Sequence, residues 1–223
     1  MATWGMLSFQ DSVSPLMEQL MFFHDHSMVV LVMITVLVFY FVSGILVNTY
    51  LNRFIVEGQE IEIFWTFIPA VLLIFMKNPS LRVLYKKEEV HCPDLTLSTV
   101  GHQWYWSYEY SDFIDIEFDS FMLPLEENSF RLLDVDNRTV LPWGVFTFIL
   151  ITSSNVIHSW ACAGLGVSFH ALSSRVNQVL FWWNRPGLYY GQCSEICGAN
   201  HSFMPIVIES VSVSAFLDWV STF

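Results

Sequence analysis

One apolar run in the sequence is long enough to cross a lipid bilayer. Residues Ser27 to Val47 carry no charged side chain over 21 positions. A helix of that length matches the hydrocarbon thickness of a bilayer, about 30 Å, at about 1.5 Å per residue. With 54% hydrophobic and 13% charged residues, the chain also does not fit a purely soluble globular domain. The run therefore predicts a transmembrane helix.

A second apolar run is shorter and is followed by basic residues. Ile63 to Met76 gives only 14 uncharged positions before Lys77 and Arg82. Apolar residues return in Ser80 to Tyr85, and the two basic side chains can snorkel or face protein. We therefore expect a second spanning helix; an interfacial or re-entrant helix is the alternative. The short polar link between the runs, Asn48 to Gln59, favours a helical hairpin.

The charge of the chain is strongly negative, with 21 Asp and Glu against nine Lys and Arg. Nucleic acid is excluded as a partner because its phosphates would be repelled. Most of the excess lies after His91, where 13 acidic residues face four Arg, so a basic partner should bind there. No Lys or Arg precedes Arg53, which argues against a removable secretory signal. Lys and Arg counting does not decide the orientation in the membrane.

After Glu89 the sequence changes to short β-prone runs separated by turn residues. These runs predict an all-β barrel or sandwich of about 130 residues. Ser212 or Ser214 can cap a short amphipathic helix at the end of the chain. We expect two parts: residues 1–90, with the helical hairpin, and residues 91–223, with the β domain. The predicted β runs are 95–110, 131–135, 145–160, 176–183, 188–190 and 203–209.

A cluster of soft metal ligands follows Gly191, in the segment GQCSEICGANHSFMP. Cys193, Cys197, His201 and Met204 combine thiolate, imidazole and thioether, a set that favours copper over zinc. A single blue-copper site uses one thiolate and two imidazoles, whereas this loop has two thiolates and one imidazole. The extra sulfur suggests two metal ions that share bridging thiolates. The second imidazole is expected from His158, at the end of a long apolar strand.

Other interpretations of this cluster remain open. Cys193 and Cys197 can form a disulfide, and an isolated histidine such as His158 is more often structural. The four positions would also line one face of a helix, but the glycines, asparagine and proline of the segment favour a loop. Cys92 and Cys162 belong to no metal pattern and are interpreted as bystanders.

Acidic and aromatic residues precede the cluster. From Glu109 to Asp136 the chain has nine acidic residues and only Arg131 as a basic one. In Ile114 to Asp119, carboxylates alternate with apolar residues, so a strand there would bury one face and expose the other. The simpler interpretation is a solvated polar face without a specific role. The functional interpretation is a docking face for a basic partner. Trp104 to Trp106 alone suggest ordinary strand aromatics.

Several motifs together closely resemble cytochrome c oxidase subunit II in its mitochondrially encoded form. They are the metal segment, GHQWYWSYEY from Gly101, VDNR from Val135, RPGLYYGQC from Arg185 and the two-helix N-terminal region. The resemblance implies a cupredoxin-like Greek-key barrel after the transmembrane hairpin. It also implies transfer of electrons from cytochrome c to subunit I, where oxygen is reduced to water with proton pumping. The expected location is the mitochondrial inner membrane, multi-pass, with the C-terminal domain in the intermembrane space.

The resemblance also implies a metal-ligand set. Cys193 and Cys197 would bridge two copper ions, the copper A centre. Each ion would be completed by an imidazole and a weaker ligand: His158 with Met204, and His201 with the backbone carbonyl of Glu195. The Glu195 side chain would reach a magnesium ion at the boundary with subunit I.

Further roles follow from the same resemblance. Trp104 corresponds to the residue at which electrons enter the chain. Glu62 is an ordinary end-of-helix carboxylate by its position, but the resemblance places it near the entrance of a proton path into subunit I. Other oxidase subunits and membrane lipid are expected partners. The carboxylates associated with cytochrome c docking are Glu109, Asp115, Asp119 and Asp136.

Two segments depart from the family pattern. Gly166 to Arg175 reads GVSFHALSSR where family members commonly carry a lysine and an aspartate, so proton or water exit contacts can differ. Lys77 in the second helix is the other departure. Competing functions are a copper-storage or assembly protein, a quinol oxidase subunit and a structural membrane scaffold. The quinol type lacks copper ligands, and all six are present here.

Overall fold

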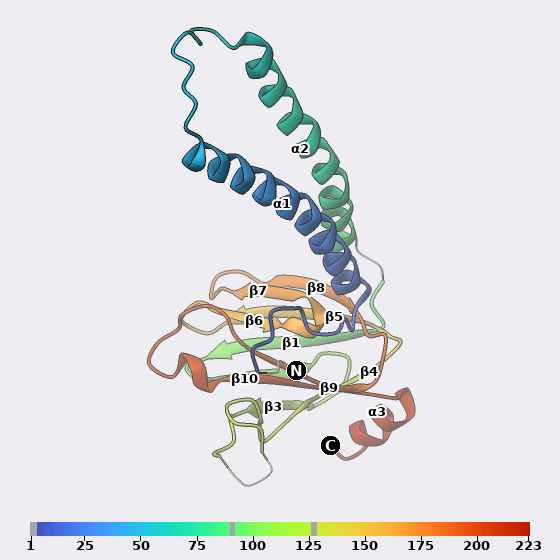
Figure 1. Ribbon diagram of the computed structural model, residues 1–223. Helices are drawn as coiled ribbons and strands as arrows, with labels where there is room; N and C mark the ends of the chain where they lie inside the picture. Colours follow the sequence, from blue (N-terminus) through green and yellow to red (C-terminus); the bar gives the residue numbers. More distant parts are fainter. Residues whose placement is uncertain (1–3, 90–91, 126–128) are drawn as a thin grey trace. The chain divides into compact units, whose positions relative to one another are not determined.

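The computed structural model describes residues 4–89, 92–125 and 129–223 (Figure 1). Two long helices come first: α1 (Pro15–Val47) and α2 (Gln59–Glu88). Both are long and apolar enough to cross a membrane. Helix α2 continues through Pro79 to Glu88, so the second apolar run does not stop at Lys77. The expectation of two apolar N-terminal helices is confirmed.

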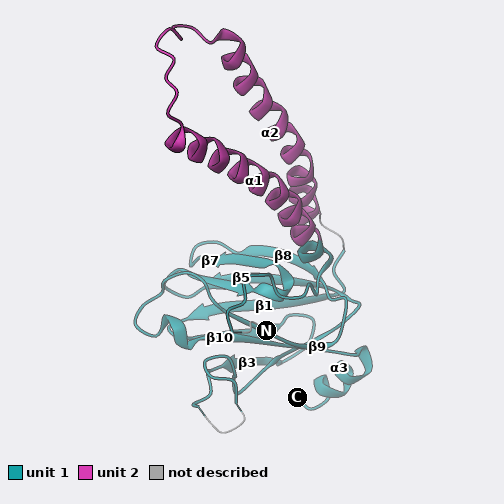
Figure 2. Cartoon of the chain, in the orientation of Figure 1, with its two compact units in different colours: residues 1–18, 90–223 teal, residues 19–89 magenta. Residues whose placement is uncertain are grey.

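The chain forms two compact units, which Figure 2 shows in different colours. One unit comprises residues 19–89, with most of α1 and all of α2. The other comprises residues 1–18 and 90–223. The N-terminal segment belongs to this second unit because it pairs with the β domain. Val13 donates its N–H to the Gly164 carbonyl at 2.9 Å, and the buried Ser14 hydroxyl donates to the Leu165 carbonyl at 2.7 Å.

The β domain consists of two five-stranded sheets. The first has the order β3-β2-β1-β5-β8 and the second the order β4-β10-β9-β6-β7. Most pairs are antiparallel, but β1 with β5 and β4 with β10 are parallel. The strands are β1 (Leu95–His102), β2 (Tyr105–Tyr110), β3 (Glu117–Ser120), β4 (Thr139–Pro142), β5 (Phe146–Ser153), β6 (His158–Cys162), β7 (Val167–Ala171), β8 (Asn177–Trp182), β9 (Gly187–Cys193) and β10 (Pro205–Val211).

One hydrophobic core lies between the two sheets. Strands β1 and β5 bury alternate residues, as expected when one face of a strand meets the core. Leu97 and Ile149 from the first sheet belong to the same buried cluster as Trp160 and Ile206 from the second. The predicted all-β domain with a cupredoxin-like fold is confirmed.

The end of the chain is also as predicted. Helix α3 (Val213–Val220) begins after Ser212, whose side chain accepts a hydrogen bond from the Ala215 N–H at 3.3 Å. Short 3-10 helices, η1 (Ala163–Leu165) and η2 (His201–Phe203), interrupt the loops.

The predicted strand at 131–135 is wrong. Residues Arg131 to Leu133 form a turn, and Leu132 has a φ of 63°. The Asp134 carboxylate accepts the Phe130 N–H at 2.6 Å and closes the turn, which outweighs the β propensity of the segment. Val135 makes only an isolated bridge with Met122.

The alternating segment Ile114 to Asp119 forms a strand only in its second half. Asp115 has a φ of 61° in a turn, and Ile114 is 90% exposed. Strand β3 begins at Glu117 because the chain must reverse first: the Tyr110 N–H bonds the Ile116 carbonyl at 3.0 Å. Ile114 therefore does not belong to the buried face that the alternation predicted.

Candidate metal centre

The candidate ligands come from two strand ends and the loop between β9 and β10. His158 is the first residue of β6, and Cys193 is the last residue of β9. These strands are antiparallel neighbours, with Trp160 opposite Cys193, so both side chains arrive at the same end of the sheet. The loop then returns Cys197 to this end before β10 begins.

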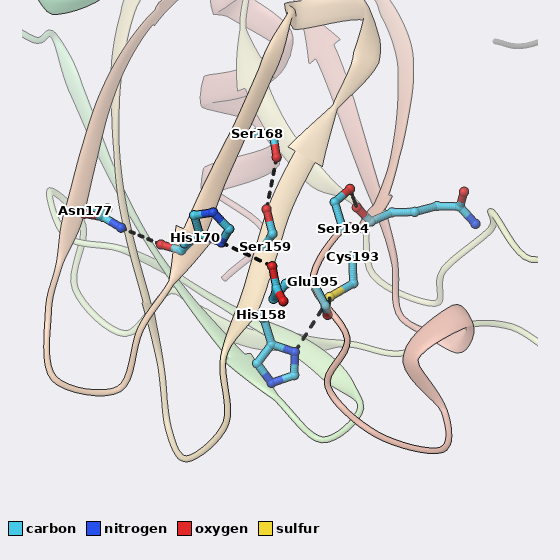
Figure 3. A network of polar contacts seen from close by, with 9 residues as sticks. His158, Ser159, Ser168, His170, Asn177, Cys193, Ser194 and Glu195 are labelled. Carbon is cyan, nitrogen blue, oxygen red and sulfur yellow. Dashed lines mark hydrogen bonds and ion pairs between the residues drawn. The ribbon is translucent and has the colours of Figure 1, made fainter.

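Each of the two sulfurs has one imidazole nitrogen and one weaker ligand atom beside it. Cys193 Sγ lies 3.8 Å from His158 Nδ1 and 3.4 Å from the backbone oxygen of Glu195. Figure 3 marks the contact between Cys193 and His158 with a dashed line. Cys197 Sγ lies 3.5 Å from His201 Nδ1 and 3.5 Å from Met204 Sδ.

Ligand atoms of His158, Cys193 and Cys197 all lie within 4.8 Å of one another. Two ligand atoms on one ion, with bonds of about 2.0 to 2.3 Å, are separated by about 3 to 4 Å. The contacts around each sulfur fall in this range.

The site is buried and its protonation follows from that burial. His158 and Met204 are almost fully inaccessible to solvent. Burial lowers the pKa of His158, and the nearby His102 and His201 lower it further, which favours the neutral imidazole that binds metals. Burial, together with the neighbouring Cys193, raises the pKa of Cys197 to about 12. Both cysteines are free thiols, so the two sulfurs need cationic partners to become thiolates.

Three residues that the sequence analysis did not assign to the metal site contact the candidate ligands. Gly101 allows the His158 ring to approach β1, because an added Cβ would lie 2.9 Å from His158 Cδ2. The buried Trp106 ring meets His158 edge-on at 5.8 Å between centroids, and its Nε1 donates to the Met204 carbonyl at 3.3 Å. Gln103 Nε2 donates to the Cys197 carbonyl at 2.9 Å. The signal was present in the GHQWYW motif, but only the fold shows which ligands it contacts.

Trp104 lies against the loop between β9 and β10, residues 194–204, here called the metal loop. It is half-buried in the turn between β1 and β2, and its ring contacts Gly198, the residue after Cys197. Among the described residues, its buried Nε1 has no hydrogen-bond partner. The indole is therefore held by packing.

The donor set fits copper better than zinc. Two imidazoles, a thioether and a carbonyl lie beside two neighbouring thiols, and methionine is seldom a zinc ligand. Two sulfurs side by side, each with its own imidazole, also fit a pair of ions better than one.

Models of one family match nearly the whole chain. The model of the periplasmic domain of cytochrome c oxidase subunit II matches residues 95–211, and that of its transmembrane domain matches residues 2–83. The chain belongs to the cytochrome c oxidase subunit II family. It is therefore a membrane protein and a subunit of an oxidase, as the sequence predicted.

Individual proteins of the same family are similar to this chain over most or all of its length. Cytochrome c oxidase subunit 2 of Drosophila subobscura is 60% identical over 224 residues, covering 99% of this chain and 98% of the relative. The subunit from Choristoneura rosaceana is 57% identical over 226 residues and covers all of both chains. The crystal structure of the periplasmic domain of subunit II of Bradyrhizobium japonicum is 42% identical, with a TM-score of 0.57. It covers 60% of this chain and 96% of that one.

The four carboxylates that the subunit II resemblance associates with docking are all exposed, in different settings. Glu109 lies on β2 and Asp115 in the turn before β3. Asp119, on β3, accepts the Ser107 hydroxyl at 2.7 Å. Asp136 accepts two backbone N–H groups, from Phe121 at 2.8 Å and from Asn137 at 2.7 Å, so it also closes a turn.

The remaining predicted residues lie outside the metal cluster. Glu62 is exposed in the first turn of α2. Cys162 is buried, which raises the pKa of its thiol to about 11, and Cys92 is exposed. Neither cysteine is among the grouped ligand atoms.

Proposed function

We propose that this chain accepts electrons from cytochrome c at a dinuclear copper A centre. It passes them to the haem and copper centres of subunit I, where oxygen is reduced to water with proton pumping. The observation that carries the proposal is the pairing around the two sulfurs: Cys193 with His158 and Glu195, and Cys197 with His201 and Met204.

The residues present provide what a one-electron relay requires. A copper pair held by these residues would supply one-electron chemistry. The chain would hold Cys193 and Cys197 as thiolates that both ions share, so the neighbours of one sulfur need not bind the same ion. We assign His158 with Met204 to one ion, and His201 with the Glu195 carbonyl to the other. Because buried, packed strands and a braced loop fix these ligands, little rearrangement accompanies each transfer.

Trp104 is the residue at which we place the arrival of electrons. Its indole is partly exposed and packs on the residue next to Cys197. An aromatic ring in this position offers a short route between a docked haem edge and the metal loop. No substrate pocket is needed for this role, because only an electron is transferred.

The acidic surface before and after β3 supports a basic partner. Glu109, Asp115, Asp119 and Asp136 are exposed in a chain of net charge -12. Charges of one sign raise the association rate of a partner of opposite sign, and salt screens this effect. Basic cytochrome c is the partner that we propose for this surface.

We also place the chain in the mitochondrial inner membrane, with the β domain in the intermembrane space. The apolar side chains of α1 and α2 would face lipid and the helices of other oxidase subunits. The exposed Glu62 would lie near a proton path into subunit I. The Glu195 carboxylate, 42% exposed, would reach magnesium at the boundary with subunit I.

Electron spin resonance on the purified oxidase tests this proposal. We expect two copper ions in this subunit, with one unpaired electron spread over both copper nuclei. Replacement of Cys193 by serine should abolish that signal, whereas replacement of the buried Cys162 by serine should leave it intact. A signal from a single isolated copper in the native oxidase would contradict the dinuclear assignment.

A further inference from the structure

Glu195 faces two sites at once. Its backbone oxygen lies 3.4 Å from Cys193 Sγ, inside the copper cluster. Its carboxylate points elsewhere: Oε2 lies 3.6 Å from Nδ1 of His170 (Figure 3). Glu195 therefore takes part in the copper cluster through its backbone and in a contact with His170 through its carboxylate.

His170 lies on the outer face of the strand pair β6 and β7. It is opposite Ser159 in the register, and its neighbour Ala171 is opposite the ligand His158. Adjacent residues of a strand point to opposite faces, so Ala171 is buried while the side chain of His170 is 63% exposed. The imidazole of His170 is thus separated from the copper ligands by the sheet itself.

Hydrogen bonds fix the backbones of both residues. Asn177 Nδ2 donates to the His170 carbonyl at 2.5 Å. Ser194, which precedes Glu195, donates its N–H to the Ser159 carbonyl at 3.1 Å. The Ser159 and Ser168 hydroxyls lie 3.1 Å apart and join the same two strands. The sheet therefore holds the two backbones side by side, and the contact between Nδ1 and Oε2 is made by two partly exposed side chains that extend from them.

The separation of these two atoms suits a shared cation. With bonds of about 2.0 to 2.2 Å, nitrogen and oxygen ligands on one ion lie about 3 to 3.6 Å apart. A neutral imidazole and a carboxylate at 3.6 Å need to move by only a few tenths of an ångström to bind the same ion. Two further observations favour a ligand role. Both side chains are accessible to an ion from solvent, and the backbone of Glu195 is positioned by its contact with Cys193.

We propose that His170 is a second ligand from this chain to the divalent cation at Glu195. The proposal rests on the proposed function, which places a cation at this carboxylate. It changes the class of that cation: imidazole suits zinc and other borderline metals, whereas magnesium prefers oxygen ligands. The site then favours Zn²⁺ over Mg²⁺, and Mn²⁺, which prefers oxygen ligands as Mg²⁺ does, serves as a paramagnetic probe of it. His170 lies in the segment Gly166 to Arg175, which departs from the family pattern.

An ordinary ion pair is the competing explanation of the same contact. If the imidazole is protonated, His170 and Glu195 form an exposed salt bridge that contributes little to stability. An ion pair gives no nitrogen coupling to a bound metal and no preference for zinc. Metal spectroscopy therefore separates the two explanations.

The test uses the assembled oxidase with Mn²⁺ loaded at this site, studied by pulsed electron spin resonance. We expect His170→Ser to remove one nitrogen coupling from the manganese. In competition, Zn²⁺ should displace Mn²⁺ from the native oxidase at a concentration on the order of tenfold lower than from His170→Ser. His26→Ser, at an exposed histidine of helix α1 that takes no part in this site, is the matched control and should change neither measurement.

Several outcomes overturn the proposal. They are an unchanged nitrogen coupling in His170→Ser, equal zinc competition in both proteins, and failure of Mn²⁺ to bind at all. The copper signal, recorded on the same samples, reports separately on the proposed function. Loss of the dinuclear copper signal in the native oxidase would contradict the function, whereas its presence without the nitrogen effect would contradict only the role of His170.

Discussion

The indole of Trp104 packs directly on Gly198, which follows the proposed copper ligand Cys197. A Cβ atom added to Gly198 would lie 3.0 Å from Cζ2 and 3.2 Å from Nε1 of Trp104. Gly198 also has a φ of 130°, a conformation that other residues rarely adopt. The absence of a side chain at this position therefore sets how closely the aromatic ring approaches the metal loop.

Replacement of Gly198 by alanine should displace the indole and slow electron uptake. We expect the reduction rate of the copper centre by cytochrome c to fall on the order of tenfold, because a small misplacement of a reacting group is costly. Stopped-flow measurement of that rate checks the prediction. Gly144→Ala is the control, because it has a φ of 74° but no atom within 4 Å of the added Cβ.

The effect of Gly198 should operate through Trp104. In a Trp104→Phe background, Gly198→Ala should cause little further loss, since the ring it displaces has already been changed. If the alanine slows the reaction equally in both backgrounds, the loss comes from the copper loop and the positioning role is wrong.

Trp104→Phe alone should separate electron transfer from binding. Because the indole N–H has no hydrogen-bond partner among the described residues, the variant loses ring area but no hydrogen bond. We expect electron uptake at saturating cytochrome c to fall by about one order of magnitude or more, with Kd nearly unchanged. Unchanged uptake would leave Trp104 with a packing role only.

The elements that carry the candidate metal ligands could be predicted because their signals are local. The spacing of Cys193, Cys197, His201 and Met204 lies within one loop, and glycine and proline mark it as a loop without knowledge of the fold. His158 was found because it ends an apolar run. Its arrival beside Cys193 follows from the pairing of β6 with β9, which no local pattern encodes.

The predictions that failed or were missed concern segments whose conformation depends on tertiary contacts. The edge strand β7 (Val167–Ala171) has only five residues and was not predicted, although it carries His170. Residues 131–135 have β propensity, but the hydrogen bond of Asp134 to Phe130 closes a turn there. The contact of Gly101 with His158 joins different sheets, so the glycine in the strand pattern could not identify the residue that approaches it.

The exposed carboxylates of Asp115 and Asp119 should accelerate capture of cytochrome c. Replacing both by asparagine should lower the association rate several-fold at low ionic strength, because attraction acts over about 30 Å at 0.01 M salt but about 8 Å at 0.15 M. Asparagine at 119 keeps an oxygen that can accept the Ser107 hydroxyl. Asp11→Asn, an exposed carboxylate on the N-terminal segment, is the control. Equal slowing at both salt concentrations would argue against docking at this surface.

Close packing of Gly101 against His158 should make copper binding sensitive to a single methyl group. In Gly101→Ala the added Cβ would lie 2.9 Å from Cδ2 of His158 and 3.1 Å from Cζ3 of Trp106, so both rings must shift. Overpacking of this kind costs about 1 to 3 kcal/mol of the free energy of unfolding. The displaced imidazole should also change the nitrogen coupling of the copper signal.

Gly164→Ala separates this local effect from general crowding. Gly164 is also buried, but its added Cβ would meet Val13 Cγ2 at 3.4 Å, an ordinary contact. We therefore expect this control to retain both the copper spectrum and the stability of the native subunit. A Gly101→Ala oxidase with a native copper spectrum would show that the ring of His158 is not held by its contact with β1, and would remove the packing explanation of the site.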